Sequence, residues 1–263
     1  MHLLILGGTF LFYFHIIQIV QIKKVVLISS STYLEFLSKM GVGGAHPGGL
    51  SLTKEIFNTE KINGNSHVLD VGCGTGQTAA YLAAHYGAKV TAMDINPIML
   101  EKAKSRMKQY QVPVEVIQGS IEDFPLKDST FDFILSESVL SFVNKPRALK
   151  EIFRLLKDGG RFIANELTVN EQLNSTNVEE IKQFYGLDSV LMEQNWIALF
   201  EQAGFKNVKV LMPKNSMLEN DSMPEFQSSE YIDPGLYTIM IQHLNILMKY
   251  QGILANRIFL CTK

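Results

Sequence analysis

The feature that most constrains the fold is a regular alternation of short apolar runs with longer amphipathic segments. The apolar runs begin at residue 67, and the first five are apolar through their middles, as strands buried on both faces of a parallel sheet are. They cover residues 67–71, 89–94, 114–117, 131–135, 161–166, 207–211 and 257–261. This alternation predicts an α/β domain with a mainly parallel sheet, in which ligands bind beyond the carboxyl ends of the strands.

Four segments between these runs have the pattern of helices. They cover residues 77–86, a stretch that begins at Asn96-Pro97, residues 146–156 and residues 190–203. The third is followed by Gly159 and Gly160, which suit the left-handed residue that closes a helix. The fourth contains Trp196, which we expect to pack between its helix and the sheet.

A glycine-rich turn follows the first predicted strand. Asp70 is followed by Gly72, Gly74 and Gly76, so the spacing is Gly-x-Gly-x-Gly with an acidic residue two positions before it. Glycines let the chain turn sharply and let a ligand press against bare backbone. The dinucleotide fingerprint would need a further glycine at position 77, where this chain has Gln77.

The second predicted strand ends in Asp94, a short distance along the chain from the glycine turn. A carboxylate at this point can accept hydrogen bonds from both ribose hydroxyls of an adenosine, and this is the function we favour. The alternative is an aspartate that caps the helix beginning near Pro97.

Four segments in order carry a family resemblance. Residues 70–76, 92–97, 118–125 and 131–138 resemble the successive signatures of class I S-adenosylmethionine-dependent methyltransferases. The likeness is closest to the small-molecule branch that includes ubiquinone/menaquinone and arsenite methyltransferases, and it extends from about His46 to the C-terminus. It implies a Rossmann-like, mainly parallel sheet of seven strands with the last antiparallel, and helices on both faces. It also implies S-adenosylmethionine as cofactor and methyl transfer to a small-molecule acceptor.

The resemblance assigns cofactor-binding roles residue by residue. The residues are Asp70, Gly72, Cys73, Gly74, Gly76, Asp94, Ile95, Ser120, Ile121 and Ser136. The glycine turn would line the methionine and ribose parts, Ile95 would pack on the adenine, and Ser136 would offer backbone to the amino group. The family usually has aspartate where Ser120 stands, and a hydroxyl accepts from the adenine amino group more weakly.

Three polar side chains are candidates for contact with the acceptor. Methyl transfer from a sulfonium mainly needs alignment and exclusion of water, so we expect no metal and require no general base. His46 lies in the glycine-rich segment 41–49, which would close as a lid; the alternative is a flexible connector. Glu137 and Glu166 follow the fourth and fifth predicted strands, where each could orient an acceptor or instead be a solvated or backbone-capping carboxylate.

Residues 212–251 form a longer connection than two neighbouring strands need. They contain an apolar stripe at helical spacing, for which we favour core packing over a substrate wall. The stripe consists of Leu236, Ile239, Met240, His243, Leu244, Leu247 and Met248.

We expect three parts in the chain: an apolar N-terminal extension over residues 1–31, a helical lid segment over 32–60, and the methyltransferase domain over 61–263 with an insertion at about 212–251. Residues 3–22 lack charge and approach the roughly 20 residues of a membrane span. An anchor, a packed apolar element and a non-native start remain open. If the segment is an anchor, Lys23 and Lys24 place the domain in the cytosol.

Net charge and cysteine content limit the partners and the cellular compartment that we expect. A net charge of -2 over 263 residues gives no basic footprint, so we expect no nucleic-acid partner. Cys73 and Cys261 lack metal-ligand spacing and predict reduced thiols in a cytoplasmic protein. Two other functions remain open: a non-catalytic S-adenosylmethionine-binding protein and, disfavoured by Gln77, a nicotinamide-dependent oxidoreductase. The sequence specifies neither the acceptor nor the oligomeric state.

Overall fold

The fold is described from a computed structural model, which covers residues 32–213 and 225–263. The expected extension at residues 1–31, with its candidate membrane segment, lies outside the described residues. Within the described part of the chain, no helix is long and apolar enough to cross a membrane.

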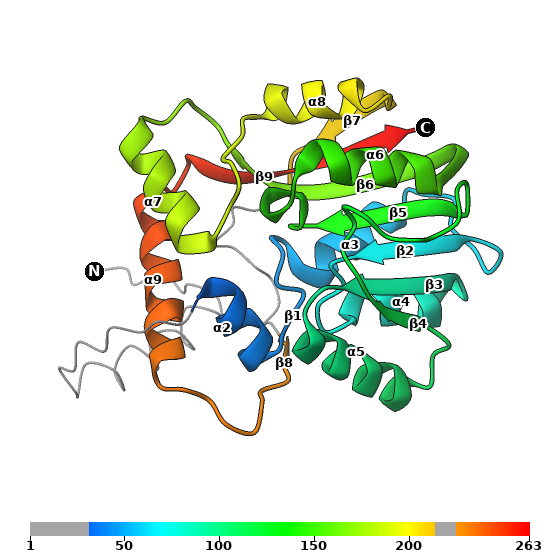
Figure 1. Cartoon of the computed structure of the whole chain (residues 1–263), viewed down its shortest axis with the longest axis horizontal. Coiled ribbons are helices and arrows are strands. Elements are labelled where there is room, and N and C mark those ends of the chain that lie inside the picture. The colour runs from blue at the N-terminus through cyan, green and yellow to red at the C-terminus, as the bar shows by residue number, and fades with distance from the viewer. Residues whose placement is uncertain (1–31, 214–224) are drawn as a thin grey trace, which may run out of the picture.

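Seven strands form one sheet in the order β4-β3-β2-β5-β6-β9-β7 (Figure 1). Strand β9 runs antiparallel to its neighbours β6 and β7, and the other neighbours pair in parallel. The predicted α/β fold, with a mainly parallel seven-stranded sheet and an antiparallel last strand, is confirmed. The strands are β2 (His67–Val71), β3 (Lys89–Asp94), β4 (Glu115–Gln118), β5 (Phe131–Glu137), β6 (Leu156–Val169), β7 (Lys206–Leu211) and β9 (Leu254–Thr262).

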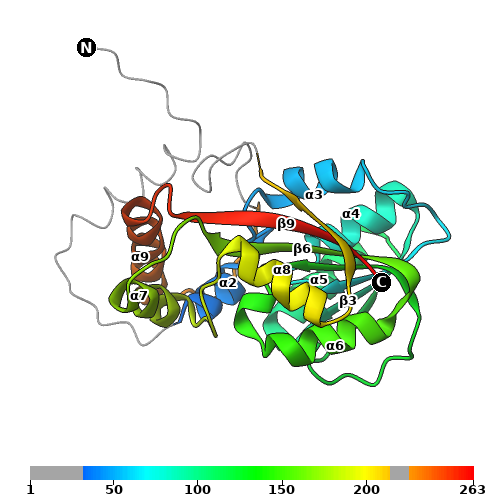
Figure 2. The same ribbon diagram turned by 90° about the horizontal axis from the view of Figure 1, so that it is seen from above.

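Helices cover both faces of this sheet (Figure 2). One face carries α3 (Gly49–Phe57), α4 (Gln77–Tyr86) and α5 (Pro97–Tyr110), and the other carries α6 (Lys145–Leu155) and α8 (Glu193–Gln202). A third group, beside the sheet, comprises α2 (Tyr33–Met40), α7 (Ser175–Tyr185) and α9 (Gly235–Lys249) (Figure 1). The remaining elements are the short helix η1 (Leu140–Phe142) and the antiparallel pair β1 (Val42–Gly43) and β8 (Glu225–Phe226).

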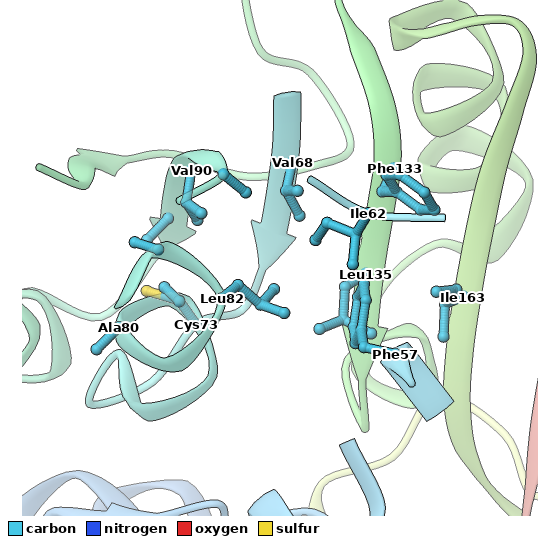
Figure 3. Close-up of a cluster of buried hydrophobic side chains, with 14 of the residues drawn as sticks. Phe57, Ile62, Val68, Cys73, Ala80, Leu82, Val90, Phe133, Leu135 and Ile163 are labelled. Carbon is cyan, nitrogen blue, oxygen red and sulfur yellow. The ribbon is translucent and has the colours of Figure 1, made fainter. Parts of the chain in front are cut away.

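Both faces of the central strands are buried, which explains their continuous apolar runs. Val68 packs into the cluster under α3, α4 and α5, while its neighbour Leu69 packs into the cluster under α6 and α8. Figure 3 shows the first cluster, in which Phe57 and Leu82 lie beside strand residues such as Leu135. Burying one such side chain contributes about 1.5–3 kcal/mol, so these faces fix the sheet that carries the site.

The second cluster contains Trp196 in the position expected from the sequence. Its ring is fully buried, stacks on Phe200 at 5.9 Å between centroids, and lies 6.2 Å from the ring of Phe259 in β9. The indole N–H donates to the carbonyl of Leu167 at 3.1 Å. The expectation that Trp196 packs between its helix and the sheet is confirmed.

The end of α6 differs from the expectation. The helix stops at Leu155, and its capping residue Leu156 is extended and already pairs with Phe131 of β5. Strand β6 therefore begins at Leu156 rather than at residue 161, with an irregularity in its pairing. Gly159 has a positive φ of 75° but lies inside this strand, so the prediction that the glycines close the helix is wrong.

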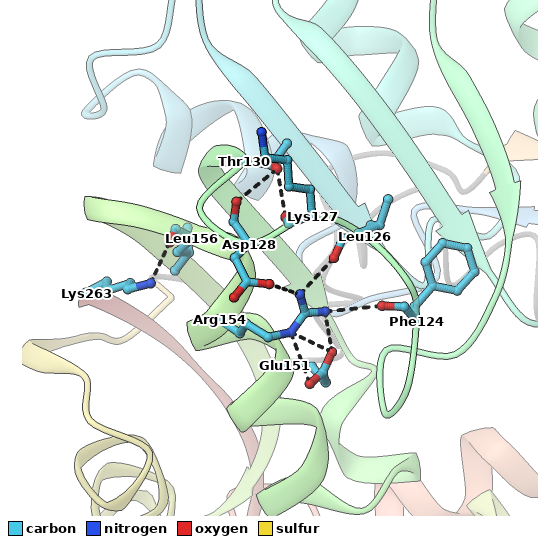
Figure 4. A network of polar contacts seen from close by, with 9 residues as sticks. All are labelled: Phe124, Leu126, Lys127, Asp128, Thr130, Glu151, Arg154, Leu156 and Lys263. Carbon is cyan, nitrogen blue, oxygen red and sulfur yellow. Dashed lines mark hydrogen bonds and ion pairs between the residues drawn. The ribbon is translucent and has the colours of Figure 1, made fainter.

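Arg154 of α6 fixes the segment between β4 and β5 (Figure 4). Its guanidinium donates to the carbonyls of Leu126 (2.7 Å) and Phe124 (3.2 Å), and it is paired with Asp128 and Glu151. Charge-assisted bonds of this kind are stronger than neutral ones. The network holds residues 124–128 against α6.

Candidate functional site

A cavity of about 550 Å³ lies at the carboxyl ends of β2, β3 and β5. Its wall contains the glycine turn after β2, residues 119–122, the end of β5, the segment 44–47, and side chains from α2 and α9. The volume falls within the roughly 300–1,000 Å³ typical of small-molecule and cofactor sites. Its place is the edge at which parallel sheets bind ligands.

The three glycines of the turn have different surroundings. Gly72 and Gly74 line the cavity, and a side-chain carbon added to Gly74 would meet nothing within 4 Å. The backbone there is open to a ligand. Gly76, with φ of 74°, precedes α4 and does not line the cavity. It faces α5, where a side-chain carbon added to it would lie 2.5 Å from the Met107 methyl and 3.1 Å from Cβ of Ala103. Gly76 thus lets α4 pack closely on α5.

Asp94 joins the end of β3 to the glycine turn. Its Oδ2 accepts from the backbone N–H of Gly74 at 2.9 Å, and its Oδ1 accepts from that of Asn96 at 2.8 Å. Helix α5 is capped by Asn96, whose Oδ1 accepts from Ile98 and Met99, so the alternative that Asp94 caps this helix is wrong. A carboxylate has about four acceptor positions, so Asp94 keeps acceptor capacity for a ligand in the cavity.

Asp70 lies at the bottom of the cavity and is 2% exposed. Burial raises the pKa of its carboxyl well above the ordinary value, and the charges of Glu137 and Asp94 raise it further. A positively charged group beside these carboxylates would reverse that effect.

Among the described residues, two buried side-chain polar atoms lack a hydrogen-bond partner: Oδ2 of Asp70 and Nε2 of His46. Both residues line this one cavity. Leaving a buried polar atom unpaired costs about 1–3 kcal/mol. The cavity is therefore suited to a ligand that offers a donor to Asp70 and an acceptor to His46.

The charges around the cavity are one-sided. Asp70, Asp94, Glu122 and Glu137 line it, whereas no lysine or arginine does so in residues 32–213 and 225–263. Such a wall favours a ligand with positive charge. It disfavours a dinucleotide, whose diphosphate is anionic.

The other predicted cofactor residues divide into two groups. Cys73, Ile95, Ser120 and Ile121 line the cavity, and Ile95 is an apolar side chain that is 69% exposed at the rim. The Ser120 hydroxyl accepts from the N–H of Glu122 at 3.3 Å. Ser136 is fully buried outside the cavity wall.

His46 and Glu137 meet beside this cavity. Nε2 of His46 lies 3.1 Å from Oε2 of Glu137, and both side chains are 6% exposed. The contact is close but poorly aligned for a hydrogen bond. Glu137 also accepts from the hydroxyls of Thr53 (2.6 Å) and Thr78 (2.9 Å). Glu137 is thus neither solvated nor a backbone cap, and His46 is part of a buried network rather than of a free connector.

The amide of Asn165 orients the His46 ring. Its Nδ2 donates to the carbonyl of Pro47 at 2.9 Å, and its Oδ1 accepts from Asn256 at 2.7 Å, so its orientation is fixed. The same Nδ2 lies 3.5 Å from Nδ1 of His46, and an amide nitrogen can only donate. The ring proton of a neutral His46 is then on Nε2, the atom without a partner.

Glu166 is not brought to the cavity. The side chain is fully buried, and its carboxylate accepts from the backbone N–H groups of Val139, Leu140 and Ser141 and from the hydroxyls of Ser136 and Ser141, at 3.0–3.3 Å. Burial raises the pKa of Glu166 to about 7, although these donors lower it. The carboxylate organises the turn that follows β5, which is the backbone-capping alternative.

A second set of contacts ties residues 32–60 to the glycine turn and to β8, and it was not foreseen from the sequence. Glu225 of β8 accepts from Gln77 at 3.0 Å and from Arg106 at 2.8 Å, while β8 pairs with β1 of the lid segment. Arg106 is almost fully buried and also donates to the carbonyl of Thr75 in the glycine turn. The partners are about 120–150 positions apart in the sequence, so no local pattern could have indicated them.

The residues of the apolar stripe of α9 make two kinds of contact: some pack in a core and some line the cavity. Leu236, Ile239 and Met240 pack with Phe36 of α2 in a small core, as expected. Met240, His243 and Leu247 also line the cavity, so the alternative of a substrate wall stays open for this part of the stripe.

Comparisons with known proteins agree with this geometry. A family model described as a methyltransferase domain matches residues 69–164. An uncharacterized methyltransferase of Bacillus subtilis, YodH, is 36% identical over 233 residues, which cover 89% of this chain and 100% of that protein. Phosphoethanolamine N-methyltransferase 1 of Arabidopsis thaliana is 30% identical over 188 residues, or 70% of this chain and 37% of that protein. The structure of Haemonchus contortus phosphoethanolamine N-methyltransferase 2 with S-adenosylmethionine aligns with a TM-score of 0.72 at 16% identity, over 90% of this chain and 58% of that one.

The fold is an α/β fold with a cavity of the size of a cofactor site at the carboxyl edge of its sheet. The chain belongs to the class I S-adenosylmethionine-dependent methyltransferases. The predicted cofactor and the predicted methyl transfer to a small molecule are confirmed at the level of the family, and the oxidoreductase alternative is wrong.

Proposed function

We propose that this chain transfers the methyl group of S-adenosylmethionine to a small molecule held between the glycine turn and helices α2, α7 and α9. The observation that carries the proposal is the pair of unpartnered buried atoms, Asp70 Oδ2 and His46 Nε2, in one cavity. The cofactor supplies a methyl carbon activated by a sulfonium, and the protein supplies position and a dry cavity.

The amino-acid part of the cofactor matches the two unpartnered atoms. An ammonium donates and a carboxylate accepts, so Asp70 would bind the first and Nε2 of His46 the second. Positive charge on the ligand also fits the carboxylates of the wall.

The adenosine part matches the rim. The free acceptor positions of Asp94 would receive the ribose hydroxyls, and the bare backbone of Gly72 and Gly74 would allow close approach. Ile95 is a suitable apolar surface for the adenine, with Ser120 and Ile121 at its edge. We propose no direct contact for Gly76 or for the side chain of Ser136.

We propose positioning roles for the two glutamates. Glu137 ties the lid segment of residues 32–60 to the sheet through His46 and Thr53, and Glu166 shapes the turn of residues 138–141, of which Ser138, Val139 and Ser141 line the cavity. In this proposal residues 32–60, with β8 and α9 of the insertion at about 212–251, form the cover over the domain of residues 61–263.

The finer assignments are also proposals. The lack of lysine and arginine on the described cavity wall supports a small acceptor over a nucleic acid, whose phosphates need such groups. The small-molecule branch remains a proposal supported by the four sequence signatures. A cytoplasmic location is supported by two buried thiols, Cys73 and Cys261, that are both unpaired.

The test is incubation of the full chain with methyl-labelled cofactor and fractionated metabolite extracts. The proposal expects label in a small organic product, and expects the product to disappear with Asp94→Ala, while Glu101→Ala, an exposed carboxylate on α5, serves as a matched control. Cofactor binding without labelled product from any extract would instead favour the non-catalytic alternative.

A further inference from the structure

Three aromatic rings from three helices form one wall of the cavity. Tyr33 of α2 lies edge-on to Tyr185 of α7, with 4.9 Å between ring centroids, and 5.3 Å from the ring of His243 of α9. All three residues line the cavity. Because aromatic pairs at these distances favour defined geometries, the three helices hold the rings in fixed positions.

The rest of this wall is apolar. The lining side chains of α2, α7, α9 and the residue after α7 include Phe36, Leu187, Met240 and Leu247, and none of the lining residues from these elements is an acid, a lysine or an arginine. Burial lowers the pKa of His243 to about 4, so its ring is uncharged at neutral pH. The carboxylates that line the cavity come from other elements: Asp70, Asp94 and Glu137 from the ends of β2, β3 and β5, and Glu122 from the segment after β4.

Two of the three rings form a polar contact within this wall. The hydroxyl of Tyr185 lies 3.0 Å from Nδ1 of His243. The other ring nitrogen, Nε2, has no hydrogen-bond partner among the residues that the structure describes. If the Tyr185 hydroxyl donates to Nδ1, Nε2 carries a proton and donates; if it accepts, Nε2 is free to accept. A hydroxyl group can serve either state.

We propose that the methyl acceptor is an uncharged, mainly apolar compound with a hydroxyl group that the Tyr185–His243 pair binds. This proposal depends on the proposed function, because it names the acceptor of that reaction.

The alternatives conflict with the wall. Among the residues that the structure describes, a phosphate or carboxylate would meet no cationic partner on this apolar surface, and an ammonium group would meet no carboxylate there. Burying an unpaired charge is far more costly than burying a hydroxyl that forms hydrogen bonds. The names of relatives that methylate phosphoethanolamine therefore do not predict the acceptor of this chain.

Three probes that share the naphthalene ring system test the proposal: naphthol, naphthyl phosphate and naphthylmethylammonium. Each is titrated into the full chain saturated with S-adenosylhomocysteine, and binding is followed by the fluorescence of the naphthalene ring. We expect naphthol to bind at least about tenfold more tightly than either charged probe, a difference of about 1.4 kcal/mol. Equal binding of the phosphate or the ammonium compound, or no binding of naphthol, would overturn the proposal.

Variants separate hydrogen bonding from apolar packing. His243→Phe keeps a ring of similar size and should weaken naphthol binding roughly three- to tenfold, since a neutral hydrogen bond contributes about 0.5–1.5 kcal/mol. His85→Phe, on the exposed surface of α4, is the matched control and should change nothing. Unchanged naphthol affinity in His243→Phe would overturn the role of the pair. Failure to bind S-adenosylhomocysteine would contradict the proposed function itself, and that titration is made first.

Discussion

His46 of the lid segment and Glu137 of β5 meet with 3.1 Å between Nε2 and Oε2. The same carboxylate accepts from Thr53 of α3 and from Thr78 of α4. One buried group therefore joins the lid segment, the helix that follows the glycine turn and the sheet. This arrangement places Nε2 of His46 beside the cavity in which Asp70 also lacks a partner.

Binding of the amino-acid part of the cofactor is tested by Asp70→Asn and His46→Ala. Each should weaken S-adenosylhomocysteine binding about tenfold or more, since hydrogen bonds to charged groups contribute about 1.5–3 kcal/mol. Methylthioadenosine lacks the amino acid and should bind to both variants as it does to the unmodified chain. Calorimetric titration measures both ligands, and parallel losses for the two would indicate general damage to the site rather than a lost contact.

Asp94→Ala tests the ribose contact. Loss of a charged acceptor should lower affinity for S-adenosylhomocysteine and for methylthioadenosine alike, by roughly 10- to 150-fold. The control variant Glu101→Ala, on the exposed surface of α5, should leave both affinities unchanged. If Asp94→Ala binds both ligands normally, the ribose assignment is incorrect.

Glu166 should make stability depend on pH. Its folded-state pKa of about 7 exceeds the ordinary 4.5, so the folded state holds this proton more tightly than the unfolded state does. Stability from this group is then full below about pH 4.5 and is lost as the pH rises through 7, a decline on the order of 3 kcal/mol. Urea unfolding at about pH 5.5 and about pH 8 should show about 2 kcal/mol of this decline, because the rest falls below pH 5.5.

The matched variant for this effect is Glu166→Gln, which cannot titrate. At the lower pH its stability should be within about 1 kcal/mol of that of the unmodified chain, because Glu166 then carries a proton and, like the amide, presents a donor to the surrounding backbone donors. The decline between the two pH values should shrink in the variant. An equal decline in both proteins would show that Glu166 does not titrate in this range.

Gly76→Ala tests whether the close packing of α4 on α5 requires this glycine. Gly76 and Gly159 have nearly equal φ values, 74° and 75°, but only at Gly76 would the added carbon lie within 3 Å of another side chain. Both variants should lose about 1 kcal/mol from the left-handed backbone, and Gly76→Ala should lose more. Thermal unfolding compares them. Equal losses would show that the close packing of α4 on α5 is not what requires this glycine.

Much of the fold follows from local pattern. The strands that contain Val68 and Ile134 are buried on both faces, and an unbroken apolar sequence indicates such strands. The beginning of β6 could not be located in this way, because Leu156 becomes a strand residue through its pairing with Phe131. That pairing depends on the whole sheet.

The sequence predicted those residues of the site that directly follow, or end, a predicted strand. Gly72, Gly74 and Asp94 lie at the cavity because each follows directly from a strand end. Long-range partners could not be assigned: Glu166 and Glu137 have similar places after neighbouring strands, yet one binds a turn of backbone and the other meets His46. Tyr185 and His243 are 58 positions apart in the sequence, so no local pattern indicates their contact. The sequence also did not decide whether the stripe of α9 packs in the core or lines a substrate site.

The most direct test of the cofactor site is calorimetric titration of the full chain with S-adenosylhomocysteine, with NAD as the control. One site of micromolar affinity for S-adenosylhomocysteine, no binding of NAD, and a weakened site in Asp70→Asn are the predicted result. Binding of NAD alone, or of neither ligand, would contradict the assignment of this cavity to S-adenosylmethionine.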